Sequence, residues 1–187
     1  MTSEEMLIKQ AAAGSEQAFS EIVRLYEKAV YNSALYIAKN REDALDISQE
    51  VFLKLWRTLP SFRGDASLKT WIAAITRTCA IDYIRERNKK QAFSLSDEEE
   101  KEFDIPDDSP QTNPEKAYEQ SQLIQEVRRA VSALPEPLRE TLILREFHNL
   151  SYAEIAELLK ISEGTVKSRI SRGREQLKEI LKSGNFL

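Results

Sequence analysis

The stretch that decides the fold is residues 150–174, which read LSYAEIAELLKISEGTVKSRISRGR. Ser151 and Glu154 have the spacing of a capping box, in which a hydroxyl and a carboxylate satisfy free N–H groups at the start of a helix. The first helix is expected to run to about Leu159. Ser162 can then cap a second, longer helix after a short turn. Two helices joined in this way predict a helix-turn-helix.

These two helices have an apolar inner side and a basic outer side. The inward-facing side chains are expected to be Ile155, Ala156, Leu159, Ile161, Val166 and Ile170. Hydroxyls and cations lie at or near the N-terminal end of the second helix, namely Thr165, Lys167, Ser168, Arg169, Arg172 and Arg174. Such a helix suits the major groove of DNA, where arginine can donate two hydrogen bonds to guanine. An ordinary solvated basic face is the alternative, but the packed turn and the basic cluster coincide, which favours DNA binding.

The rest of the chain also has helical periodicity, and no run alternates with a period of two for long enough to predict a strand. One helix is expected after Ser15, with apolar positions at Phe19, Ile22, Val23, Tyr26, Val30 and Tyr31. The next starts at Asn40 or Arg41, ends at Pro60, and carries on one side Ala44, Leu45, Ser48, Val51, Phe52, Leu55, Trp56 and Leu59. Further helices are expected at about 67–90, 114–133 and 138–147. The fold class is therefore predicted to be all-α.

The charge is distributed unevenly along the chain. The net charge is −4, but residues 1–93 and 121–187 each carry +2, and residues 94–120 carry −8. The acidic run and prolines between residues 94 and 113 predict a flexible linker, because like charges repel and little there could form a core. Two small helical domains, 1–93 and 114–187, are expected on either side, so the acidic overall charge does not exclude nucleic acid.

Several classes of protein are not expected. The sequence has no run of 18 apolar residues, so no membrane insertion is predicted. The acidic N-terminus does not resemble a secretory signal. A single cysteine, Cys79, cannot form an internal disulfide, which fits a reducing cytoplasm. Its side chain is expected to be buried, and the sequence leaves open whether it has a redox role. The sequence contains no metal-ligand spacing, no nucleophile paired with a base and no glycine-rich phosphate loop, so no metal, cofactor, small-molecule substrate or enzymatic activity is predicted. The only histidine, His148, is expected to be structural.

A second surface lies on the helix that starts near residue 40. With its apolar side buried, this helix presents one mostly acidic and polar face, made of Asp46, Gln49, Glu50, Leu53 and Arg57. Periodicity alone favours a plain solvated face here, because acidic faces and single surface leucines are common.

Three motifs together resemble the extracytoplasmic-function, or group 4, sigma factors of the sigma-70 family. Residues 150–174, with Leu134-Pro135 and Leu138-Arg139-Glu140 before them, are similar to region 4. The pattern Asp43-x-x-Asp46-x-x-Gln49-Glu50-x-Phe52 is similar to region 2.2. The segment Ser61-Phe62-Arg63-Gly64-Asp65-Ala66-Ser67-Leu68-Lys69-Thr70-Trp71-Ile72 is similar to the family's segment between regions 2.3 and 2.4.

The resemblance implies three functional surfaces. Core RNA polymerase would bind at Asp43, Asp46, Gln49, Glu50 and Leu53. The −10 element of the promoter, with one base flipped out, would be bound by Phe62, Arg63, Asp65, Ser67, Lys69, Arg77, Thr78 and Arg85. The cations would contact phosphates and Phe62 would stack on a base. The −35 element would be read by Thr165, Lys167, Ser168, Arg169, Arg172 and Arg174.

Some positions depart from the family pattern. Ala74 and Thr78 stand where arginine and asparagine are common, which leaves the preferred −10 sequence open. Gly173 replaces a usual alanine and is expected to lower helix stability. Trp71 could act as a wedge for strand opening, although packing in the core is the favoured interpretation.

The function predicted from these features is promoter-specific transcription initiation, stress-responsive and controlled by an anti-sigma factor. A free-standing helix-turn-helix regulator is the main alternative. A net charge of only +2 in residues 1–93 and again in residues 121–187 predicts weak unaided DNA binding, which docking on polymerase would overcome by raising the effective concentration at the promoter. The acidic linker would either occupy a basic channel of the polymerase or serve as a plain spacer. A cytoplasmic location is expected.

Overall fold

The computed structural model describes residues 3–93 and 114–183 as a set of packed helices, without a strand in either range. The N-terminal set is α1 (Ser3–Ala12), α2 (Glu16–Ala38), α3 (Arg41–Thr58), the 3₁₀ turn η1 (Leu59–Ser61) and α4 (Leu68–Phe93). The C-terminal set is α5 (Pro114–Ala133), α6 (Glu136–Glu146), α7 (Tyr152–Leu159) and α8 (Glu163–Ser183). The prediction of an all-α fold is confirmed. The expected linker at 94–113 lies outside the described residues.

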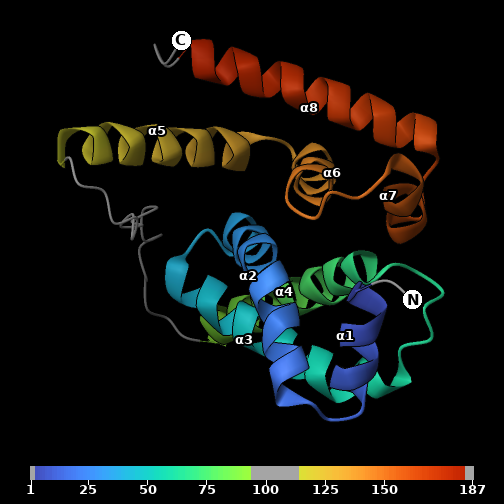
Figure 1. Ribbon diagram of the computed structural model, residues 1–187. Coiled ribbons are helices and arrows are strands. Elements are labelled where there is room, and N and C mark those ends of the chain that lie inside the picture. Colours follow the sequence, from blue (N-terminus) through green and yellow to red (C-terminus); the bar gives the residue numbers. More distant parts are fainter. Residues whose placement is uncertain (1–2, 94–113, 184–187) are drawn as a thin grey trace.

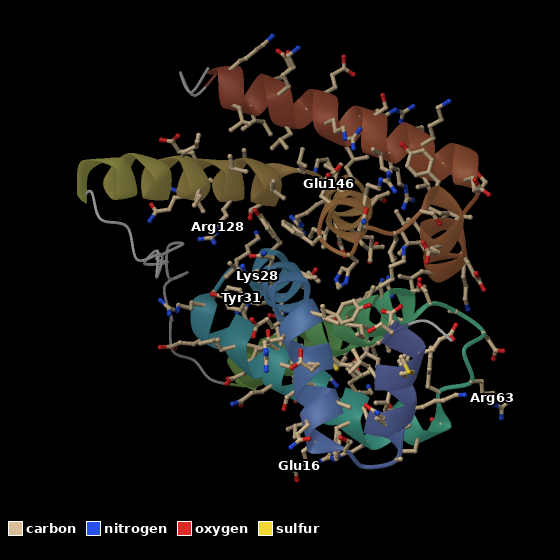
Figure 2. All side chains as sticks on the ribbon, in the orientation of Figure 1. Glu16, Lys28, Tyr31, Arg63, Arg128 and Glu146 are labelled. Carbon is tan, nitrogen blue, oxygen red and sulfur yellow. The ribbon has the colours of Figure 1, made fainter. Side chains whose placement is uncertain are left out.

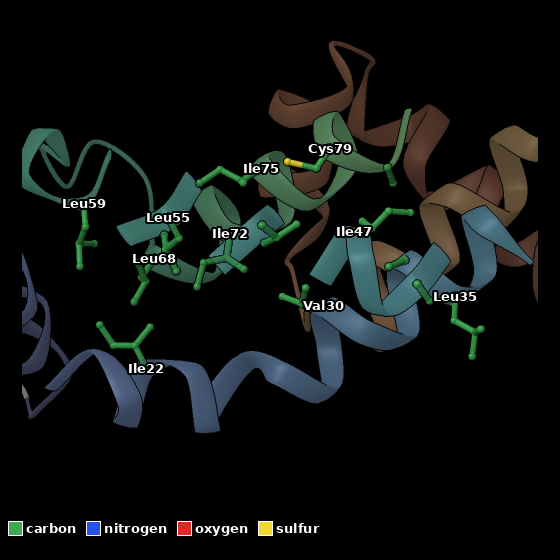
Figure 3. Close-up of a cluster of buried hydrophobic side chains, with 14 of the residues drawn as sticks. Ile22, Val30, Leu35, Ile47, Leu55, Leu59, Leu68, Ile72, Ile75 and Cys79 are labelled. Carbon is green, nitrogen blue, oxygen red and sulfur yellow. The ribbon is translucent and has the colours of Figure 1, made fainter. Parts of the chain in front are cut away.

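Helices α2, α3 and α4 enclose the core of the N-terminal set, with α1 packed against α2 (Figure 1). Side chains of all three long helices converge there (Figure 3), and the largest of those that are completely buried are Ile22, Val30, Leu35, Ile47, Val51, Leu55 and Ile72. Cys79 is buried in the same core, as expected. The expected caps form as well. Ser15 accepts a hydrogen bond from Ala18 N, and Asn40 Oδ1 accepts from Glu42 N and Asp43 N.

Two expectations about these helices are wrong. Leu45 was assigned to the buried side of α3, but it is 49% exposed, and Ile47 is buried instead. Helix α1 was not predicted. It is short, and three of its side chains hold it in place. Leu7 and Ile8 pack on the core, and Glu4 accepts a hydrogen bond of 2.6 Å from Tyr26 Oη. Tertiary contacts therefore define this helix.

Helices α6, α7 and α8 build the C-terminal core. Leu150, Ile155, Val166 and Ile170 are all buried in it, as the sequence predicts for the last three. Helix α6 begins at Glu136, two residues before the expected start at Leu138. Pro137 is tolerated in its first turn, where a backbone N–H would have no helical partner in any case.

Gly173 has a packing role that the sequence did not indicate. A Cβ atom at this position would lie 2.8 Å from Leu142 Cδ1 and 3.1 Å from Leu142 Cγ. The missing side chain lets α8 pack closely on α6, whereas the expected effect of glycine on the stability of α8 stays a prediction.

The C-terminal helices lie directly on the N-terminal bundle (Figure 1). Ala73 of α4 is 1% exposed and belongs to the C-terminal hydrophobic cluster. The rings of Tyr36 in α2 and Phe147, which follows α6, are stacked with centroids 5.4 Å apart. The two sets of helices thus share an apolar interface. Within the described ranges, every helix is too short or too polar to cross a membrane.

Candidate polymerase and nucleic-acid interfaces

The expected docking face on α3 is largely open to solvent. Asp46, Gln49 and Glu50 are exposed, and Leu53 is 49% exposed between them. This face follows from the burial of Ala44, Ile47, Val51 and Leu55 on the other side of α3. A carboxylate face around one apolar side chain suits a basic partner.

Asp43 differs from the other members of this predicted face. Its carboxylate accepts hydrogen bonds from Arg87 Nη1 and, at 2.8 Å, from Tyr83 Oη, and its side chain is 15% exposed. Burial and the bond to Asp43 raise the pKa of Tyr83 to about 12. Asp43 therefore ties α3 to α4, and its charge is already paired.

The loop between η1 and α4 carries part of the expected −10 surface. Gly64 has φ +77°, a left-handed conformation that favours glycine. Arg63 and Asp65, on either side of it, are exposed, and Arg63 lies at the outer edge of the molecule (Figure 2). Phe62 is partly buried and stacks on Trp71 with ring centroids 4.8 Å apart. Trp71 thus packs on the core, as favoured from the sequence, and one face of the Phe62 ring is already covered.

Ser67 and Lys69 meet a carboxylate from the other set of helices. Glu154 of α7 accepts hydrogen bonds of 2.8 Å from the hydroxyls of Ser67 and Thr70. Lys69 Nζ lies 3.2 Å from Glu154 Oε2 and donates to Asn149 O at 3.1 Å. Ser67 Oγ also accepts from Thr70 N at the start of α4.

Glu154 has the most strongly shifted carboxyl pKa among the described residues. Burial alone would raise it, but hydrogen bonds from the Ser151 backbone and from the hydroxyls of Ser67, Thr70 and Ser151 outweigh burial and lower the pKa to about 2. The Ser151 contacts are the predicted capping box, which forms as expected. Glu154 thus both caps α7 and binds the start of α4.

The remaining candidates for −10 binding lie along α4. Arg77 Nε donates to Glu140 Oε1 of α6, so its charge is paired across the two sets of helices. Thr78 is exposed, and its hydroxyl donates to Ala74 O at 2.9 Å. Arg85 is exposed beside Asp82. Of the eight predicted residues, three therefore contact α7, α6 or the loop between them.

The expected −35 helix, α8, starts where the sequence places it. Ser162 Oγ accepts from Thr165 N at 3.1 Å, and Lys160 ends α7 with φ 55°. Lys167 and Arg172 are exposed.

The other three predicted residues of α8 have partners within the protein or are partly buried. Arg169 is partly exposed, and Ser168 donates to Thr165 O. Arg174 is exposed, and its Nη2 donates to Glu146 Oε1 of α6 at 2.6 Å.

His148 lies between the two sets of helices. It is 4% exposed, and its Nε2 is 2.8 Å from Ser33 Oγ of α2. Nδ1 has no hydrogen-bond partner among the described residues, and burial lowers the pKa of His148 to about 4. A structural role is consistent with this burial, but the partner in α2 was not foreseen. Nothing in the local pattern could indicate it, because the two residues are 115 positions apart.

The described residues contain no group of three or more His, Cys, Asp or Glu side chains that could hold a metal ion. A cavity of about 20 Å³, the size of one water molecule, lies between α2, α4 and α6. Ser33, Thr76, Arg77, Glu140 and His148 are among the residues that line it. The chemistry available on these surfaces is recognition by charge, by hydroxyls and by the exposed leucines of α3, Leu45 and Leu53.

Comparison with known proteins identifies both halves of the chain. Residues 22–90 match sigma-70 region 2, and residues 124–177 match sigma-70 region 4. The RNA polymerase sigma-H factor of Pseudomonas aeruginosa is 32% identical over 180 residues, which is 95% of this chain and 93% of that protein. The extracytoplasmic-function sigma-E factor of Escherichia coli K12 is 34% identical over 178 residues, 94% of this chain and 92% of that protein.

Two solved structures have similar folds. The sigma factor RpoE of Bartonella quintana, in complex with the anti-sigma factor NepR, has a TM-score of 0.70 and 26% identity over 88% of this chain and 96% of that one. CnrH, in complex with the cytosolic domain of CnrY, has a TM-score of 0.69 at 22% identity over 97% of this chain and 99% of that one, which supports the fold. With full-length relatives above 30% identity and both regions matched, the chain belongs to the extracytoplasmic-function sigma factors of the sigma-70 family.

Proposed function

We propose that this chain is a group 4 sigma factor that docks on core RNA polymerase through α3 and reads two promoter elements with α4 and α8. The observation that carries the proposal is that one all-helical chain matches both sigma-70 region 2 and sigma-70 region 4. A free-standing regulator would need only the helix-turn-helix, which lies in the second of these.

The docking surface in this proposal consists of Asp46, Gln49, Glu50 and Leu53. Their exposure supports a role in binding, and the carboxylates favour a partner with a basic surface. Asp43 is assigned instead to holding this face in place, since it is bound to Arg87 and Tyr83 of α4.

The −10 surface is proposed to comprise the loop around Gly64 and the adjoining part of α4. Arg63, Asp65, Thr78 and Arg85 are exposed, which supports direct contact with a separated DNA strand. Phe62 is proposed to support the loop through its stacking on Trp71 and to offer a base its uncovered face. Ser67, Lys69 and Arg77 become available only if their bonds to Glu154 and Glu140 open.

The −35 surface is proposed to be the N-terminal half of α8. Lys167, Arg169 and Arg172 would supply contacts to phosphates and guanine edges, and Thr165 and Ser168 would lie beside them. Arg174 is proposed to play a smaller part, because Glu146 holds its guanidinium.

The proposed domain boundaries are 1–93 for region 2, 94–113 for a linker and 114–187 for region 4. The matches to region 2 and region 4 fall within the first and last of these. We further propose that the protein acts in the cytoplasm, where RNA polymerase works, has no enzymatic activity of its own, and is controlled by an anti-sigma factor under stress. The complex of its Bartonella relative with an anti-sigma factor supports the last point.

Reconstituted transcription tests the proposal. The purified protein, added to core RNA polymerase and a library of genomic DNA fragments, should produce discrete run-off transcripts that core polymerase alone does not make. Specific binding of promoter duplex by the protein without polymerase at physiological salt would favour a free-standing regulator instead.

The docking face is tested by charge reversal at Glu50. Glu50→Lys should abolish binding to core polymerase while the circular dichroism spectrum stays unchanged, because the side chain is exposed and makes no packing contribution. Glu27→Lys, an equal charge change at an exposed position of α2, should bind normally. Retained binding by folded Glu50→Lys would show that polymerase docks elsewhere.

A further inference from the structure

The C-terminal turns of α4 have few buried side chains. Among the residues of α4 whose burial is described, 68–89, Ala80 is the last that is buried. Beyond it, Tyr83 and Ile84 are partly buried against the core, and Lys89 is exposed. Helices in proteins are held in place mainly by the packing of their buried side chains. This end of α4 therefore needs another attachment in order to keep a fixed direction.

Asp43 of α3 supplies that attachment. Its carboxylate accepts a hydrogen bond of 2.8 Å from Tyr83 Oη and another from Arg87 Nη1. Both donors come from the part of α4 that follows Ala80, and their spacing of four residues places them on the same side of the helix. The side chain of Asp43 is 15% exposed, and hydrogen bonds to a charged group are stronger than those between neutral groups. Asp43 thus fastens the end of α4 to α3.

The position of Asp43 itself is fixed by α3. It lies in the first turn of this helix, which Asn40 caps by accepting a hydrogen bond of 3.2 Å from Asp43 N. The neighbouring side chains Ala44, Ile47 and Val51 are each at most 1% exposed. Loss of the bonds between the two helices should therefore release the end of α4, while α3 and its exposed docking face stay in place.

The direction of this part of α4 matters for Arg85. The side chain of Arg85 is 65% exposed, and it lies two residues from both Tyr83 and Arg87. Residues two apart in a helix do not share a face, so Arg85 points away from α3. Thr78, two turns earlier, lies on the same side of α4 as Arg85. This part of the proposed −10 surface therefore lies on the side of α4 opposite to the bonds with Asp43.

We propose that Asp43 is a positioning residue for the −10 surface, which fixes the end of α4 through Tyr83 and Arg87 and so aims Arg85 at a phosphate of the promoter. The proposal rests on the function proposed above for α4 and Arg85. It gives Asp43 a different task from Asp46, although the resemblance to the family assigns both to polymerase docking. Asp43 acts through Arg85 and contacts neither polymerase nor DNA.

Two affinities, measured on full-length variants, test the proposal. The first is the affinity for core polymerase, and the second is the affinity of the assembled holoenzyme for a promoter from the run-off experiment, taken over a range of salt concentrations. Asp43→Asn removes the charge of the acceptor with little change in shape. Tyr83→Phe removes one donor without changing the charge, and so keeps the test open in the event that Asp43→Asn does not fold. Glu86→Gln, at the exposed position beside Arg87, is the control with the same charge change as Asp43→Asn.

The salt dependence of promoter binding reports the phosphate contact. Loss of one such contact lowers the slope of log affinity against log salt concentration by about 1. Arg85→Ala should show this loss, and Asp43→Asn should show most of it. The two substitutions together should have no larger effect than Arg85→Ala alone, because one acts through the other. Tyr83→Phe should have a smaller effect, Glu86→Gln should match the wild type, and none of these variants should lose affinity for core polymerase.

Several outcomes would overturn the proposal. Weaker binding of Asp43→Asn to core polymerase, to the extent expected for Asp46→Ala, would show that Asp43 docks on polymerase. Additive effects of Asp43→Asn and Arg85→Ala on the slope would show that Asp43 does not act through Arg85. An unchanged slope in both Asp43→Asn and Tyr83→Phe would show that the bonds do not position α4. A wild-type holoenzyme that binds no promoter would instead overturn the proposed function.

Discussion

Gly173 lies in α8 against Leu142 of α6, and a methyl group there would approach that leucine to 2.8 Å. Two opposing effects act at this position. Alanine is favoured over glycine by about 1 kcal/mol within a helix, whereas overpacking a core costs about 1–3 kcal/mol. At such a short distance the steric term should dominate.

Gly173→Ala is therefore expected to lower the free energy of unfolding by up to about 2 kcal/mol, the largest difference between these terms. Chemical denaturation followed by circular dichroism measures it. The control is Gly164→Ala in the first turn of the same helix, where a Cβ would meet only Ser162 Oγ, at 3.8 Å. That variant should be neutral or slightly more stable. An equal gain in stability from both substitutions would contradict the packing role of Gly173.

Asp43 and Asp46 provide a second contrast at the scale of single residues. Asp43 is bound to Arg87 and Tyr83, whereas Asp46 is exposed on the proposed docking face. Asp43→Ala should lower the free energy of unfolding by about 1–3 kcal/mol, because it removes a charge-assisted bond and strands its partners. Asp46→Ala should leave stability unchanged and weaken binding to core polymerase. Thermal unfolding measures the stability of both variants, and a pull-down with core polymerase measures their binding. A stable Asp43→Ala variant with weakened binding, beside a destabilised Asp46→Ala variant, would contradict these assignments.

At the scale of elements, α8 combines the proposed reading of the −35 element with a structural role. Its exposed cations are free to contact DNA, but Arg174 is also bound to Glu146 of α6. Holoenzyme carrying Arg172→Ala should lose about 1–3 kcal/mol of discrimination at one position of the −35 element. Arg174→Ala should lose less, since its guanidinium is already engaged. Transcription from promoters with single substitutions in the −35 element measures both, and equal losses would show that the bond to Glu146 opens on DNA.

At the scale of the whole molecule, the packing of the two sets of helices against each other should depend on pH. His148 has a pKa of about 4 in the packed form because of burial, and an ordinary value near 6.5 in a separated form, in which it is exposed to solvent. Above pH 6.5 the ring is neutral in both forms and the packing keeps its full stability. Between pH 6.5 and about 4 only the separated form binds the proton, so the packing weakens progressively.

At pH 5.5 the ratio of the packed to the separated form should fall by about tenfold relative to pH 7.5, as one pH unit below the pKa of the separated form requires. Energy transfer between dyes on cysteines introduced at the exposed positions Gln17 in α2 and Glu175 in α8 measures this ratio. His148→Gln should remove the dependence in this range, because glutamine carries no titratable group. Glu154 acts in the same direction only at lower pH, below 4.5 and towards 2, where its hydrogen bonds from Ser67 and Thr70 would be lost. A pH-independent ratio in the wild type would place His148 outside the interface.

The helices and the helix-turn-helix were predictable because their causes are local. The spacing of Ser151 and Glu154, the cap at Asn40 and the apolar period of α8 act within a few residues, and each was found where the sequence placed it. The same holds for the exposed positions of α3 around Leu53. The exposure of Leu45, which was expected to be buried, and the burial of Ile47, which the sequence had not assigned to the core, show the limit of periodicity, because both side chains are apolar.

The sequence alone thus determined an all-helical chain with a capped helix-turn-helix and an acidic helix face, since hydrogen bonds and apolar spacing within each helix specify these features. The tertiary structure decided which charged side chains are already bound to a partner within the protein. Glu154 reaches Ser67 across 87 positions, Glu140 reaches Arg77 across 63, and Gly173 fits against Leu142. Contacts of this kind depend on how whole helices pack against one another, and no local pattern in the sequence specifies that packing.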